Sequence, residues 1–151
     1  MIVQILVAII STLAFAVLFH VPRQEYLYCA VNGGLGWAVY QMCLDSGIGV
    51  TVSSLWSALA LTLVARILSA VRKMPSTVFL LAGIFTLVPG SGVYYTAYYL
   101  IMNDLSASTS KGIETAKIAG AIVLGIIFGL ALPQSWFNRL GRVTERNQDE
   151  K

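Results

Sequence analysis

The sequence predicts an all-α integral membrane protein with five transmembrane helices, and three observations support this fold class. Only 11% of the 151 residues are charged and 57% are hydrophobic, whereas a soluble domain carries about 25% charged residues. The charges gather in short clusters between long apolar segments. Each segment is near the ~20 residues that a helix needs to span a bilayer. These segments are residues 2–19, 26–44, 50–71, 77–102 and 113–132.

The first two segments are predicted to be retained membrane helices. Residues 2–19 lack the basic start and the small-residue cleavage site of a signal peptide. The second segment contains Asn32-Gly33-Gly34-Leu35-Gly36. Because an unpaired amide is costly in hydrocarbon, Asn32 is expected to face another helix or water. Gly33 and Gly36 have two interpretations: they shape a substrate site, or they let two helices pack closely.

The third segment carries several hydroxyl side chains and one arginine. Ser54, Ser57 and Thr62 are expected to share a face, where hydroxyls commonly join helices. Arg66 also lies within this segment. Its guanidinium either meets an anionic substrate or extends to the inner membrane interface.

The fourth segment is predicted to be a broken helix, because Pro89-Gly90 lies at its centre. Proline removes a backbone donor and clashes with the preceding turn. In a bilayer such a break persists only where protein or a wet cavity satisfies the freed groups, as in the substrate sites of many transporters. We expect one piece to end near Val88 and the next to begin near Ser91, with free amides at mid-depth that favour a carboxylate. The alternative is a simple proline kink.

Hydroxyl and aromatic side chains surround the predicted break. Ser91 is expected to cap the second piece or to bind ligand, and Gly92 follows it. At helical spacing Tyr94 lies over Tyr98, and Tyr95 lies over Tyr99. These tyrosines either line a transport pathway or form an aromatic belt at the outer interface.

The distribution of Lys and Arg predicts an N-terminus outside and a C-terminus in the cytoplasm. This orientation leaves only Lys111 and Lys117 outside, in or near an external loop over residues 103–112. It places eight basic residues inside, namely Arg23, Arg66, Arg72, Lys73, Arg139, Arg142, Arg146 and Lys151. Residues 1–132 thus form one membrane domain, and residues 133–151 form a polar cytoplasmic tail.

No pattern typical of catalysis, metal binding or cofactor binding is present. His20 is the only histidine, Cys29 and Cys43 have no metal-ligand spacing, and no Walker motif occurs. We therefore predict no enzymatic activity and no cofactor. The net charge of +3 fits membrane topology and lipid headgroups, and no nucleic-acid motif accompanies it.

Two stretches of the chain resemble the threonine/serine exporter family, and more narrowly the short subunit of its split form. They are AVNGGLGWAVYQM and LVARILSAVRKMPSTVFLLAGIFTLVPGSGVYYTAYYLIMND, and the resemblance covers roughly residues 10–130. A basic loop precedes a proline and an apolar run that ends in Leu-Val-Pro-Gly, followed by a tyrosine. The matching residues are Arg72, Lys73, Pro75, Leu87, Val88, Pro89, Gly90 and Tyr94, with Gly33, Gly36 and Trp37 in the second segment. Thr86 stands where the family often has proline.

The resemblance implies ion-driven export of threonine and serine from a bacterial cell membrane, with a larger membrane subunit supplying the other half. A related bacterial pair is associated with succinate export, so a dicarboxylate exporter is the first alternative. A non-transporting assembly subunit is the second. Five helices cannot form two equal inverted halves, which independently favours a partner. A higher oligomer with several copies of each subunit is a further expectation. The expected substrate site comprises Pro89, Gly90, Ser91, Gly92, Tyr94, Tyr95, Tyr98, Asn32, Gly33, Gly36 and Arg66.

Overall fold

The computed structural model describes residues 2–133, and within them all regular structure is helical. The elements are α1 (Ile2–Leu18), the short 3₁₀ helix η1 (Arg23–Glu25), α2 (Tyr26–Asp45), α3 (Val50–Arg72), α4 (Ser76–Ile84), α5 (Gly90–Ile101) and α6 (Leu105–Ala131). The all-α prediction is confirmed. The predicted cytoplasmic tail lies outside the described residues except for Pro133. Among the described helices, α3 and α6 are long and apolar enough to cross a membrane, and α1 is apolar but shorter.

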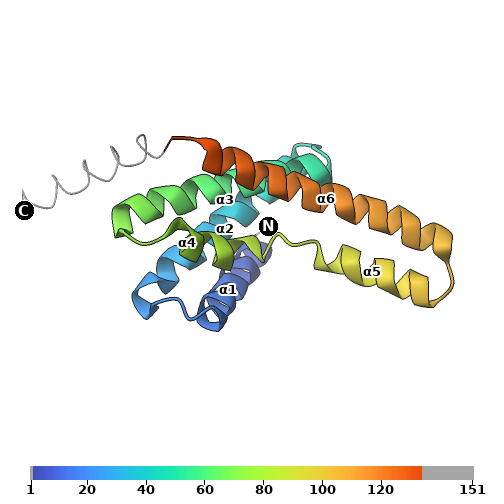
Figure 1. Cartoon of the computed structure of the whole chain (residues 1–151), viewed down its shortest axis with the longest axis horizontal. Coiled ribbons are helices and arrows are strands. Elements are labelled where there is room, and N and C mark those ends of the chain that lie inside the picture. The colour runs from blue at the N-terminus through green and yellow to red at the C-terminus, as the bar shows by residue number, and fades with distance from the viewer. Residues whose placement is uncertain (1, 134–151) are drawn as a thin grey trace, which may run out of the picture.

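Helices α1 to α4 and the C-terminal half of α6 form a bundle (Figure 1). Glycines allow the closest approaches within it. A Cβ atom at Gly125 of α6 would lie 2.6 Å from the carbonyl oxygen of Leu55 in α3, and one at Gly36 of α2 would lie 2.8 Å from Leu61 Cδ1. The backbones of α3 and α6 therefore meet directly at Gly125, while Gly36 makes room for the Leu61 side chain; such small residues at contacts are typical of helices associated in membranes.

Helix α5 and the N-terminal half of α6 extend away from this bundle as an antiparallel pair, which we call the arm (residues 90–118; Figure 1). Among the described helices, α5 packs only against α6. None of its residues is buried. The single long helix α6 thus belongs both to the bundle and to the arm.

Hydrogen bonds from polar side chains to backbone carbonyls connect the bundle helices. Asn32 Nδ2 donates to the Phe79 carbonyl of α4 at 3.2 Å, so Asn32 faces another helix as expected from the sequence. Ser57 of α3 donates to the Gly36 carbonyl of α2. Each of these bonds supplies a partner for a buried polar group that hydrocarbon would leave unpaired.

The end of the bundle at which α3 terminates holds two arginines with different roles. Arg66 Nη1 donates to the carbonyls of Gly129, Leu130 and Leu132 at 2.9, 2.9 and 2.6 Å. The last carbonyls of a helix have no intrahelical partner, so Arg66 supplies one for α6. Arg72 binds both carboxylate oxygens of the buried Glu25 and lies 4.6 Å from the Tyr28 ring centroid. This pair joins η1 to the end of α3.

The expected external loop over residues 103–112 is wrong. Helix α6 begins at Leu105, and only Met102 to Asp104 separate it from α5. Asp104 accepts a hydrogen bond from the Ala107 amide at 3.0 Å and so caps the helix. Two of the side chains that favoured a loop donate to backbone carbonyls, Thr109 to Leu105 of the same helix and Ser108 to Thr96 of α5.

Candidate functional site

The break in the fourth segment is real and wider than expected. Helix α4 ends at Ile84, earlier than the predicted end near Val88, and α5 begins at Gly90. The Thr86 and Leu87 amides bond to carbonyls three residues back, and the Thr86 hydroxyl donates to the Gly83 carbonyl at 2.7 Å. These tight turns end α4 before the proline. Pro89 then disfavours helical backbone at Val88.

Pro89 itself forms a tight turn that exposes the start of α5. Its φ and ψ of −75° and 60° are those of an inverse γ-turn, closed by the Gly90 amide donating to the Val88 carbonyl at 2.7 Å. Gly90 is therefore already engaged. The amides of Ser91 and Gly92 have no acceptor among the described residues. Two free N–H groups and the positive end of the helix dipole remain available to an anion.

A cavity of about 420 Å³ lies beside this break, within the range of about 300–1,000 Å³ typical of small-molecule sites. Val50 and Ser54, from the first turns of α3, line it together with the break, so it lies toward the N-terminal end of α3. The lining residues are Trp37, Tyr40, Val50, Ser54, Thr86, Leu87, Val88, Pro89, Ser91, Gly92, Tyr95, Tyr99, Lys111, Glu114, Thr115 and Ile118.

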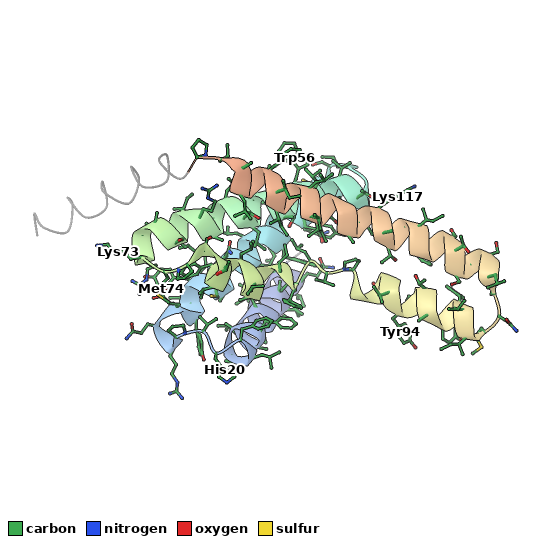
Figure 2. All side chains as sticks on the ribbon, in the orientation of Figure 1. His20, Trp56, Lys73, Met74, Tyr94 and Lys117 are labelled. Atoms are coloured by element: carbon green, nitrogen blue, oxygen red, sulfur yellow. The ribbon has the colours of Figure 1, made fainter. Side chains whose placement is uncertain are left out.

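Four of the residues predicted to form the substrate site line this cavity: Pro89, Ser91, Gly92 and Tyr95. Tyr94 and Tyr98 belong to the other tyrosine row, with rings 6.3 Å apart, and do not line it. Tyr94 is 62% exposed and lies on the side of α5 that faces away from α6 (Figure 2). Of the two rows, the Tyr95–Tyr99 row therefore faces the cavity.

The remaining predicted site residues lie elsewhere. Gly90 is exposed beside the cavity with open space around it. Gly33 packs against the Thr12 side chain of α1, and Gly36 against Leu61 of α3, which is the close-packing interpretation of these glycines. Asn32 bonds to α4, and Arg66 bonds to the end of α6. None of these five lines the cavity.

Several cavity residues were not among the predicted site residues. Trp37 Nε1 is buried and has no partner among the described residues. Leaving such a buried donor unpaired costs about 1–3 kcal/mol. Trp37 and Thr86 also line a second, more apolar cavity of about 350 Å³ beside α1, so these two side chains lie between the cavities. Lys111 was missed because residues 103–112 were predicted to form a loop, and Glu114 lies just inside the predicted fifth segment, where no site residue was expected.

Comparison with known proteins places this geometry in context. The sequence profile of the family described as Threonine/Serine exporter, ThrE, matches residues 4–132. An uncharacterized protein of Haemophilus influenzae is 27% identical over 90% of this chain and 47% of its own length. A probable threonine/serine exporter of Mycobacterium tuberculosis is 23% identical over 90% of this chain and 26% of its own length. No solved structure matches. The chain thus spans about half or less of the curated relatives it matches.

Proposed function

We propose that this chain, which belongs to the threonine/serine exporter family, is one membrane subunit of a two-component secondary exporter of small amino acids. Membership of this family makes it a membrane transport protein. The observation that carries the finer proposal is the open break: Ser91 and Gly92, whose amides are unpaired, line one cavity together with Trp37, whose buried indole N–H has no partner among the described residues. These donors suit the carboxylate and hydroxyl oxygens of threonine and serine.

The membrane arrangement we propose has five crossings in a bacterial inner membrane, with the N-terminus outside. Helices α1, α2, α3 and α6 each make one crossing, while α4 and α5 together make the broken one. A broken crossing requires protein or a wet cavity around its freed backbone groups. The cavity beside α5 meets that requirement on one side, and a partner subunit is proposed to cover the other.

The proposed partner is a larger membrane subunit, assembled with this chain in one or more copies. Two observations support it. The chain covers 47% and 26% of the two relatives reported above, so each of these proteins contains a further region. Helix α5 leaves every one of its residues unburied, including Tyr94 at 62% and Ile101 at 82% exposure. In the complex, rocking of one half against the other would alternately open the cavity to each side.

A direct test loads cells with labelled threonine, serine or succinate and follows efflux with and without this chain. We expect its removal to slow efflux of threonine or serine and to leave succinate efflux unchanged. Selective loss of succinate efflux would instead identify a dicarboxylate exporter. If removal changes no efflux but dissociates a larger membrane protein from its complex, the chain is an assembly subunit.

Replacing Gly92 with alanine should impair export by separating α5 from α6. A Cβ atom there would clash with Thr115 Oγ1 and lie 3.2 Å from its Cβ and Cγ2. Thr115 cannot turn away freely, since its hydroxyl donates to the Lys111 carbonyl at 2.7 Å. Such overpacking costs about 1–3 kcal/mol. We expect the initial rate of efflux to fall severalfold at equal amounts of protein in the membrane.

Gly90→Ala is the matched control for this variant. The glycine lies two residues earlier on the same helix, and an added Cβ atom would meet nothing within 4 Å. Its efflux should equal that of the native chain. Equal loss in both variants would show that flexibility of the break, rather than contact between α5 and α6, limits export.

A further inference from the structure

The cavity beside α5 has two charged side chains in its lining, Lys111 and Glu114. Both come from the N-terminal half of α6, on the arm. Lys111 Nζ and a carboxylate oxygen of Glu114 are 2.7 Å apart. Glu114 is therefore the one carboxylate among the described residues that line this cavity, and Lys111 is its cation.

This ion pair is accessible and weak. The side chains of Lys111 and Glu114 are 43% and 53% exposed, and exposed pairs contribute only about 0–1 kcal/mol. The Glu25–Arg72 pair differs sharply, because its carboxylate side chain is 5% exposed and Arg72 holds both of its oxygens. A ligand can thus replace Lys111 as the partner of Glu114 at little cost.

The other groups in the cavity complement a ligand that carries both charges. The free amides of Ser91 and Gly92 attract an anion, and Lys111 adds a positive charge to the same cavity. Tyr95 and Tyr99, whose stacked ring centroids lie 6.2 Å apart, line it as well, and aromatic rings attract cations. Near neutral pH an amino acid carries one ammonium and one carboxylate.

We propose that Glu114 binds the ammonium group of a zwitterionic amino acid and is the residue that selects amino acids over dicarboxylates. The proposal rests on the exporter function above. In the empty cavity Lys111 is paired with Glu114. When substrate enters, its ammonium replaces Lys111, whose freed charge then faces the substrate carboxylate. A dicarboxylate brings no cation for Glu114 and is repelled by it.

The test measures exchange of labelled threonine in membrane vesicles from the source cells, with each variant replacing the native chain. Three unlabelled competitors are used: threonine, N-acetylthreonine, which has no cation, and threonine methyl ester, which has no anion. For Glu114→Gln we expect the apparent affinity for threonine to fall at least about tenfold, or about 1.4 kcal/mol. The affinity for N-acetylthreonine should not fall. Glu114→Asp keeps the carboxylate and should retain the native preference.

Lys117→Gln is the matched control, because Lys117 is exposed and lies on the side of α6 away from α5 (Figure 2). It does not line the cavity, so its competition profile should be native. If the native chain exchanges threonine and Glu114→Gln keeps the native profile, the role of Glu114 is refuted while the exporter function stands. If the native chain adds no exchange of threonine or serine, both proposals fail.

Discussion

Arg66→Met is expected to cause the largest loss of stability of any single change considered for this chain. Nη1 of Arg66 is the donor for three carbonyls at the end of α6, and the arginine is 4% exposed. Methionine fills similar space but donates nothing. A buried acceptor left without a partner costs about 1–3 kcal/mol. We expect a marked drop in the temperature at which detergent-solubilised protein loses its monodisperse peak in size-exclusion chromatography.

Two variants separate this role of Arg66 from a general effect of charge. Arg66→Lys keeps a cationic donor and should recover part of the loss. Arg23→Met removes an exposed arginine near the same end of the bundle. It should leave the midpoint temperature of this thermal transition unchanged. A native midpoint for Arg66→Met would show that the three carbonyls find other donors, such as lipid headgroups or water.

Gly125→Ala is expected to disrupt the contact between α3 and α6. A Cβ atom at this position would lie 2.6 Å from the Leu55 carbonyl oxygen, 2.9 Å from Ala58 Cβ and 3.0 Å from the Leu59 amide nitrogen. Two of these atoms are backbone, which cannot change rotamer. The helices must therefore move apart, at a cost of about 1–3 kcal/mol or more. The same thermal measurement should show a lower midpoint.

Gly120→Ala on the same helix provides the comparison. An added Cβ atom there would meet nothing within 4 Å, and alanine has the higher helix propensity by about 1 kcal/mol. The temperature midpoint of Gly120→Ala should equal or exceed that of the native chain. If both alanine variants lower the midpoint alike, backbone flexibility of α6 rather than close packing against α3 explains the glycines.

The helical fold and the break could be predicted because each depends on local sequence. Long apolar segments predict helices, and Pro89 interrupts one of them. The extent of the break was less predictable, since α4 ends early through the bond from the Thr86 hydroxyl to Gly83. The start of α6 was missed, although an aspartate such as Asp104 is a common N-cap residue. In the structure its carboxylate accepts a hydrogen bond from the Ala107 amide.

The composition of the cavity depends on tertiary contacts and was harder to predict. Helical spacing identified two tyrosine rows, but the packing of α5 against α6 decides that Tyr95 rather than Tyr94 lines the cavity. The motif glycines in the second segment were ambiguous because close packing and a substrate site favour the same residue type. In the structure these glycines pack against Thr12 and Leu61. Arg66 was ambiguous for a similar reason, since its acceptors lie 63 to 66 residues away.

The continuity of α6 restricts how the molecule can move. Its 27 residues form an unbroken rod of about 40 Å at 1.5 Å per residue, attached to the bundle at one end and to α5 at the other. The only direct chain connection between α4 and α5 is the short non-helical link that contains Pro89. A swing of the arm must therefore bend at that link while α6 pivots as a lever. Displacement at Glu114 would therefore reach the other end of the rod, where Arg66 bonds to its last carbonyls.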